Sequence, residues 1–206
     1  MLLRFLGHAC FYLEDGESTL VIDPYDPSTG ALPEVSAKVV TLSHGHHDHS
    51  YADGVCGVET TIIEPGAWGA AGIEGEGLST FHDDAQGAKR GPNIVQIVKM
   101  GGQTIVHLGD LGHMLDENVL AKLRGCDVLL VPVGGFYTID AATATAICDA
   151  VAPRVIIPMH YKVESRRKLP IATVEPFLEG KAQVQAMEED SVDPASMRGV
   201  VVLSSK

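Results

Sequence analysis

Four side chains suited to metal binding lie within six residues of one another. His44, His46, Asp48 and His49 follow the spacing H-x-H-x-D-H. In an extended loop, side chains two residues apart point to the same side, so His44 and His46 can face one ion while Asp48 and His49, past the bend, face a second. Imidazole and carboxylate groups are common ligands of first-row divalent metals. The spacing therefore predicts a metal site, from which His47 points away.

Further histidines and an aspartate follow other predicted strands. A buried strand at 38–42 leads into the cluster, and residues 78–81, 103–107 and 155–157 have the pattern of further strands. Candidate ligands at or just after these strands are His82 with its neighbouring carboxylates, His107, Asp110 and His160. Strand ends are where open α/β layers build sites, so we expect these residues to gather around the cluster. Gly109 and Gly112 are expected to let the backbone approach the metal centre closely.

The rest of the chain supplies the elements that must position these residues. Hairpins come first, with strands at 2–6, 9–13 and 19–22, a short helix at 48–54, strands at 60–63 and 78–81, and a hairpin of 94–99 with 103–107. Helices at 115–123, 139–151 and 173–178 then alternate with strands at 127–131, 155–157 and 199–203. This order predicts two layers of sheet with helices outside. The Pro/Gly-rich stretches at 24–33 and 64–77 are expected to be loops over the site.

Composition narrows the class of protein. The 206 residues carry a formal net charge of −12, which opposes a large nucleic-acid surface but leaves a small anionic substrate open. The four cysteines form no CxxC pair and are expected to be reduced core residues. No run approaches the roughly 18 apolar residues that span a membrane, and the N-terminus lacks a signal-peptide pattern, so we expect a cytoplasmic protein. The hairpin at 2–13 and the C-terminal strand are compatible with an edge that pairs with a second copy, although such strands more often lie in a core.

The chain resembles the metallo-β-lactamase-fold hydrolases, and more closely their lactonase-like, Zn-dependent branch. The H-x-H-x-D-H loop, the Gly109-Asp110 aspartate and the late His160 carry the resemblance, together with Leu6-Gly7-His8-Ala9, Ile22-Asp23-Pro24, Thr80-Phe81-His82-Asp83 and Pro158-Met159-His160-Tyr161. It covers nearly the whole chain in the expected order. It implies a mixed α/β (α+β) fold, a four-layer αββα sandwich, as one domain over residues 1–206.

The resemblance also implies two divalent ions, Zn²⁺ first, with Mn²⁺ or Fe²⁺ as alternatives. One ion would take His44, His46 and His82, and the other Asp48, His49 and His160, with Asp110 bridging. His107 competes with His82 for the third histidine, and His82 is preferred because His107 is expected to lie within its strand. A metal-bridging hydroxide, oriented by Asp48, would attack a carbonyl or phosphorus centre.

Residues beyond the ligands have expected roles as well. Asp23 would accept a hydrogen bond from a ligand histidine and fix its tautomer. His8, His107, His113 and Tyr137 are candidates for substrate contacts or proton delivery, although each has an equally good structural explanation.

The expected activity is hydrolysis of a small ester, lactone or phosphoester. One alternative is a phosphodiesterase acting on a small nucleotide-like molecule, which a basic pocket would favour; the basic runs are at 89–90, Lys162 and 166–168. The other alternative is a non-catalytic metal-binding or sensor protein. The expected partner is a small-molecule substrate.

Overall fold

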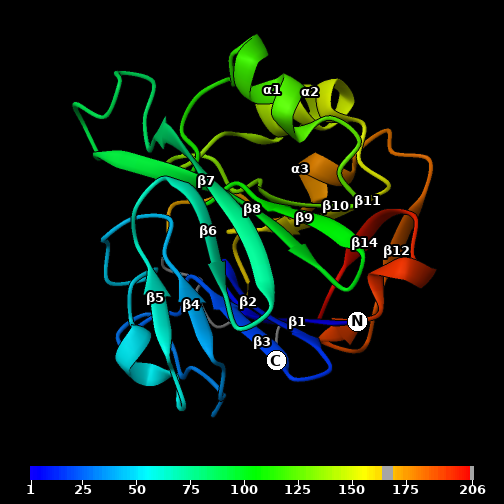
Figure 1. Ribbon diagram of the computed structural model, residues 1–206. Coiled ribbons are helices and arrows are strands. Elements are labelled where there is room, and N and C mark those ends of the chain that lie inside the picture. Colours follow the sequence, from blue (N-terminus) through cyan, green and yellow to red (C-terminus); the bar gives the residue numbers. More distant parts are fainter. Residues whose placement is uncertain (164–168, 205–206) are drawn as a thin grey trace.

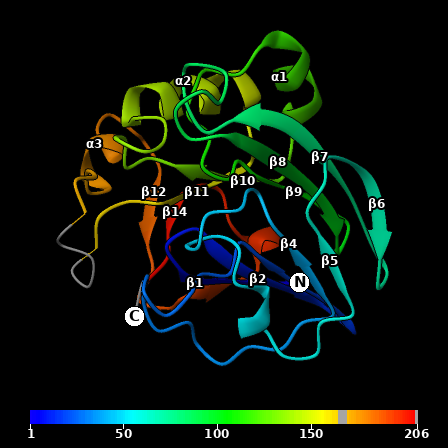
Figure 2. The ribbon, with the colours of Figure 1, turned by 90° about the vertical axis from the view of Figure 1, so that its left-hand side faces the viewer.

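Two β-sheets lie face to face, and helices cover the outer face of the larger one (Figures 1 and 2). This arrangement is seen in a computed structural model that describes residues 1–163 and 169–204. The basic run at 166–168 lies outside the described residues.

The first sheet is mixed and has the strand order β13-β1-β2-β3-β4-β5. Its strands are β1 (Leu2–Gly7), β2 (Cys10–Asp15), β3 (Ser18–Ile22), β4 (Val39–Thr41), β5 (Thr60–Ile62) and β13 (Ser191–Val192). The pairs β13–β1, β1–β2 and β2–β3 are antiparallel, whereas β3–β4 and β4–β5 are parallel.

The second sheet has the order β12-β14-β11-β10-β9-β8-β7-β6. Its strands are β6 (Gly66–Ala70), β7 (Ile73–Phe81), β8 (Pro92–Met100), β9 (Gln103–His107), β10 (Val128–Pro132), β11 (Val155–Met159), β12 (Val184–Ala186) and β14 (Gly199–Val202). The hairpins β6 to β9 are antiparallel, and the remaining pairs are parallel.

Aspartates begin the two longer helices. The Asp116 carboxylate accepts hydrogen bonds from the backbone of Asn118 and Val119 at the start of α1 (Glu117–Leu123), and Asp140 accepts one from Thr143 at the start of α2 (Ala141–Val151). These contacts satisfy amide groups that the first turn of a helix leaves free. A third helix, α3 (Glu175–Leu178), and two 3₁₀ helices, η1 (Ala52–Gly54) and η3 (Pro194–Ser196), complete the described elements.

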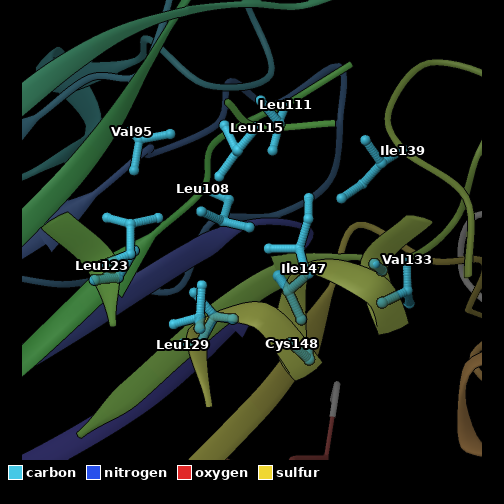
Figure 3. Packing of buried hydrophobic residues seen from close by; sticks show 14 of the residues in the cluster. Val95, Leu108, Leu111, Leu115, Leu123, Leu129, Val133, Ile139, Ile147 and Cys148 are labelled. Atoms are coloured by element: carbon cyan, nitrogen blue, oxygen red, sulfur yellow. The ribbon is translucent and has the colours of Figure 1, made fainter. Parts of the chain in front are cut away.

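Alternation along the strands produces two apolar layers. In β10, Val128 and Leu130 belong to the core between the sheets, while Leu129 and Val131 belong to the core beneath the helices. Figure 3 shows this second core, where Ile147 and Cys148 of α2 pack over the sheet. Strand β10 is therefore buried on both faces, as is usual for parallel strands covered by helices.

A smaller apolar cluster covers the outer face of the first sheet. Tyr25 and Val55 pack there against Val21 and Val40. In the described part of the chain this layer consists of connecting segments and η1, without an α-helix. The expected mixed α/β architecture with two facing sheets is confirmed.

Several local predictions were wrong. The stretch 64–77 is largely the hairpin of β6 and β7, whose Trp68 and Ala70 pack against the core between the sheets. The helix expected at 48–54 is reduced to the single turn of η1. By contrast, β1 and β14 each lie between two neighbours, so neither is an edge strand, in line with the expectation that such strands more often lie in a core. Cys56 is exposed, whereas the other three cysteines are buried.

Candidate metal centre

The candidate ligands leave the two sheets at one common edge. In the first sheet, β3 ends next to Asp23 and β4 leads into the loop of residues 44–49. In the second sheet, β7 ends next to His82, β9 leads to Asp110 and β11 ends next to His160. These strand directions explain how residues more than a hundred positions apart in the sequence converge.

His44, His46 and His82 form the first group, with their ligand atoms within 4.8 Å of one another. The Nδ1 atom of His44 lies 2.9 Å from Oγ of Ser43, which leaves Nε2 to face the group. Burial lowers the pKa of His44 to about 3. Its imidazole is therefore neutral at pH 7, the form that binds metals.

His8, Asp48, His49 and His160 form the second group, again within 4.8 Å. The Nε2 atom of His8 lies 3.2 Å from Oδ2 of Asp48, and the rings of His8 and His160 are 4.3 Å apart. His8, expected to contact substrate or deliver a proton, is thus placed against the candidate ligands themselves. Sequence reasoning did not place it in this group, although its Gly7-His8 turn between two strands was visible.

Asp110 lies between the two groups. Its Oδ2 is 3.2 Å from Nε2 of His82 and 3.3 Å from Nε2 of His160, while its Oδ1 is 3.2 Å from Nε2 of His49. Burial alone would raise the pKa of this carboxyl, but the facing imidazoles of His160 and His49 hold the pKa well below its usual value. Asp110 is therefore an ionised carboxylate in contact with both groups.

Asp23 fixes the orientation of His49. Its fully buried carboxylate lies 2.8 Å from Nδ1 of His49 and accepts hydrogen bonds from the backbone N–H and the hydroxyl of Ser43. An Nδ1–H donated to Asp23 leaves the Nε2 lone pair of His49 directed at Asp110. Asp23 thus makes the contact that the sequence predicted for it. The part of Ser43, which directly precedes the motif, was not recognised.

His107 is not available as a ligand. Its Nε2–H donates to the carbonyl of Ala9 at 2.8 Å, and its Nδ1 accepts from the backbone N–H of Gly109 at 3.0 Å. The side chain is fully buried, which favours the structural explanation of His107 over a contact with substrate. The geometry favours His82 over His107 as the third histidine.

His113 and Tyr137 belong to neither of the two groups. The Nε2 of His113 accepts from the backbone N–H of Phe81 at 3.2 Å, and its Nδ1 lies 2.8 Å from the carbonyl of Met114. His113 therefore ties its own loop to the end of β7, which fits its structural explanation, and a role in proton delivery stays a prediction. Tyr137 is partly exposed and lies beneath Arg90, with the guanidinium carbon 5.6 Å from the ring centre.

Asp83, the carboxylate next to His82, holds its loop rather than facing the ligands. It accepts four backbone N–H groups, those of Ala85, Gly87, Lys89 and Arg90, at 2.7–2.9 Å. These contacts overcome the effect of burial and lower the pKa of Asp83 to about 2. The carboxylate therefore fixes the segment that carries His82.

Buried Asn93 fixes the segment that carries Asp110. Its Oδ1 accepts from the backbone N–H of Asp110 at 2.9 Å, and its Nδ2 donates to Thr80 and Leu108. Nothing in the sequence marked this asparagine.

The two glycines near Asp110 serve close packing of the chain, not approach to a metal. A Cβ atom at Gly112 would lie 2.4 Å from the backbone of His82 and Asp83, and one at Gly109 would lie 2.3 Å from Oδ1 of Asn93. The prediction that they approach the metal centre is therefore corrected: they let the ligand-bearing loops pack on one another.

Three residues at this edge have left-handed backbone conformations. The φ angles are +59° at His8, +50° at Asp23 and +51° at His160. Residues other than glycine seldom adopt this region, and such strain clusters at functional sites. The backbone N–H of His160 donates to the carbonyl of His8 at 2.9 Å, which helps to hold two of the three.

The donor set fits divalent cations. Buried polar atoms without a hydrogen-bond partner lie here in the part of the chain that the structure describes, among them Nε2 of His44, Nε2 of His49 and Oδ1 of Asp110. Buried polar atoms are almost always paired, so this concentration of free lone pairs around one carboxylate calls for a bound cation.

Comparison with known proteins decides the family. Residues 2–160 match the Beta-lactamase superfamily domain. The chain belongs to the metallo-β-lactamase superfamily. It is 32% identical over 198 residues to a UPF0173 metal-dependent hydrolase of Archaeoglobus fulgidus, covering 78% of this chain and 83% of that one. A UPF0173 metal-dependent hydrolase of Pyrococcus abyssi is 30% identical over 189 residues, covering 77% and 84%.

A solved structure agrees with these sequence matches. The protein of Thermotoga maritima assigned to the Zn-dependent hydrolases of the metallo-beta-lactamase superfamily superposes with a TM-score of 0.81 at 36% identity, covering 100% of this chain and 99% of that one. The chain is thus a metal-dependent hydrolase of the metallo-β-lactamase superfamily. No helix in the described part of this family member is long and apolar enough to cross a membrane.

Proposed function

We propose that this protein is a dinuclear hydrolase of small esters, lactones or phosphoesters. His44, His46 and His82 would hold one ion, Asp48, His49 and His160 the other, and Asp110 would bind both. The observation that carries this assignment is the place of Asp110, whose carboxylate lies within 3.3 Å of histidines from both groups. A carboxylate placed in this way would be able to bind both cations of a two-metal site, in which the ions lie about 3.5–4 Å apart.

Zinc is the proposed metal, with Mn²⁺ or Fe²⁺ as alternatives. Mixed imidazole and carboxylate ligands suit all three, and the Thermotoga maritima relative is described as Zn-dependent. When bound, the two ions would lower the pKa of a water molecule towards neutrality and polarise the oxygen of the scissile group.

The protein's own groups would orient the reactants. The side chain of Asp48 is 27% exposed, against 3% for Asp110, so Asp48 is the carboxylate that a water molecule can reach. Partial burial would raise the pKa of Asp48, but the contact with His8 holds the pKa well below its usual value. Asp48 would therefore stay ionised and accept a hydrogen bond from the attacking water, while His8 fixes the position of its carboxylate.

The test is hydrolysis by protein reconstituted with metal. The panel consists of a lactone, a thioester, a phosphodiester and a phosphomonoester. It is run with wild type, Asp110→Ala and, as a matched control, His47→Ala, which changes the histidine of the motif that belongs to neither ligand group. We expect turnover of one class of bond, which is lost in Asp110→Ala and kept in His47→Ala. Absence of turnover from wild type shown to carry two ions would refute hydrolysis of these bonds and favour a metal-binding protein without catalysis.

A further inference from the structure

Arg90 is a basic residue that makes no ion pair within residues 1–163 and 169–204. Several other basic side chains in the described ranges pair with carboxylates, as in Lys89–Asp84, Lys122–Glu76, Arg124–Glu117 and Arg154–Asp127. Within those same ranges Arg90 has no ion pair. Its Nη2 donates to the carbonyl of Phe136 at 3.0 Å, and its guanidinium lies over the ring of Tyr137. Since a guanidinium has five N–H donors, most remain available to an anion.

The place of Arg90 is at the edge that carries the metal ligands. Arg90 lies just before β8, and its backbone N–H donates to Asp83, the residue after His82. Phe136 lies a few residues beyond β10. Because β8 and β10 are the two neighbours of β9, the Arg90–Phe136 hydrogen bond joins the loops on either side of the segment that leads to Asp110.

The loop that holds Phe136 also packs on the second group of ligands. Gly134 lies so close to His160 that a Cβ atom there would be 2.2 Å from its carbonyl oxygen. The loop that holds Arg90 carries His82 of the first group. The pair Arg90 and Phe136 is thus attached to both groups.

Phe136 presents an apolar ring at this place under strain. Its side chain is 63% exposed, and its φ angle is +60°, a conformation that an aromatic residue rarely adopts. The ring lies 4.7 Å from that of Tyr137 in an edge-on arrangement, and the backbone N–H of Tyr137 donates to Gly135 at 2.7 Å. An exposed aromatic ring held in a strained turn next to a catalytic edge is a candidate for ligand contact.

We propose that Arg90 and Phe136 recognise the part of the substrate remote from the bond that is hydrolysed, and that this part combines an apolar group with an anionic one, a carboxylate or a phosphate. The inference rests on the proposed function. The overall charge of −12 repels anions at long range, and Arg90 supplies a local positive charge at this edge in addition to that of the proposed metal ions. This contact makes Arg90 and Phe136 determinants of specificity, whereas the ligands of the metals determine the chemistry.

The experiment measures binding without turnover. Benzohydroxamic acid and its 3-carboxy and 4-carboxy derivatives share a metal-binding group and a ring, and differ only in a remote anion. Their dissociation constants are measured by calorimetry on metal-loaded wild type, Arg90→Gln and Lys89→Gln. Glutamine keeps an N–H for the carbonyl of Phe136 while removing the charge. Lys89→Gln is the matched control, because Lys89 is the neighbouring cation and is already paired with Asp84.

The expected result is a preference for at least one carboxy derivative. Wild type should bind it about fivefold more tightly than benzohydroxamic acid, the upper range for an exposed ion pair. The preference should disappear in Arg90→Gln and persist in Lys89→Gln. In Phe136→Ala the advantage of benzohydroxamic over acetohydroxamic acid should also fall.

Two results would overturn the inference while leaving the proposed function intact. One is equal binding of neutral and carboxylated probes by wild type, and the other is a preference that survives in Arg90→Gln. If Arg90 only joins the two loops, Arg90→Gln would weaken all three probes equally, which also overturns it. Failure of every hydroxamate to bind wild type that carries two ions would overturn the proposed function itself, and this inference with it.

Discussion

Replacing Asp23 by asparagine should weaken the binding of the second ion more than that of the first. The amide oxygen can still accept the backbone N–H of Ser43 at the position of Oδ1. The amide NH₂ then occupies the place of Oδ2, which lies 2.8 Å from Nδ1 of His49. Two donors cannot share that contact, so His49 must move its proton to Nε2, the atom directed at Asp110, or turn its ring.

Two independent estimates give the same magnitude for this loss of metal affinity. A hydrogen bond to a charged group contributes about 1.5–3 kcal/mol. Removing a carboxylate that orients a ligand histidine usually costs about 10–100-fold in metal affinity, or about 1.4–2.7 kcal/mol. We therefore expect the affinity for one of two ions to fall by about 10–100-fold.

The assay is competition with a chromogenic chelator, combined with metal analysis of the dialysed protein. Asp26→Asn is the matched control, because its carboxylate accepts hydrogen bonds from the backbone N–H and the hydroxyl of the neighbouring Ser28 and belongs to neither ligand group. The expected result is one tightly held ion in Asp23→Asn and two in the control. Unchanged affinity for both ions in Asp23→Asn would refute the role of Asp23 in setting the tautomer of His49.

Three further changes test the assignment. Asp110→Ala, which removes the carboxylate between the groups, should lose both ions, and full occupancy by metal analysis would contradict a shared ligand. Gly112→Ala places a Cβ 2.4 Å from the backbone of His82 and Asp83. We expect this to lower the free energy of unfolding by about 1–3 kcal/mol, as measured by thermal unfolding. Gly45→Ala is the control, because a Cβ there meets nothing within 4 Å. Asp83→Asn should be less stable than wild type at neutral pH. Because the pKa of Asp83 in the folded protein is lowered to about 2, its stabilisation is present above the usual aspartate pKa of about 4 and is lost as the pH falls towards 2. The unfolding curves of the two proteins should therefore converge in acid, and a difference that persists at pH 2 would argue against this cause.

The candidate ligands could be predicted from the sequence, but the hydrogen bonds that position them could not. The H-x-H-x-D-H spacing and the strand-end positions of Asp110 and His160 were visible because strands have a period of two and apolar runs mark their ends. The choice between His82 and His107 needed the structure, since only hydrogen bonds to Ala9 and Gly109 show that both nitrogens of His107 are engaged.

The other misses have physical reasons. The hairpin at 64–77 was interpreted as a loop because Gly and Ala are weak strand formers, yet pairing with β8 and burial of Trp68 against the core outweigh that preference. Asn93 was invisible because its three contacts are with distant backbone and side-chain groups, which no local pattern records. The short β12 and β13 carry too few residues to show a period.

The candidate ligands are divided between the two sheets, and this division has a mechanical consequence. His44, His46, Asp48 and His49 belong to the loop after β4 of the first sheet, whereas His82, Asp110 and His160 follow strands of the second. Ions bound by all of them would cross-link the two sheets at the edge where the ligands lie. Without ions, buried imidazoles and a carboxylate would face one another where the two sheets meet. Loading with metal would thus add a link between the sheets to that made by the apolar core, and chelation would remove that link alone.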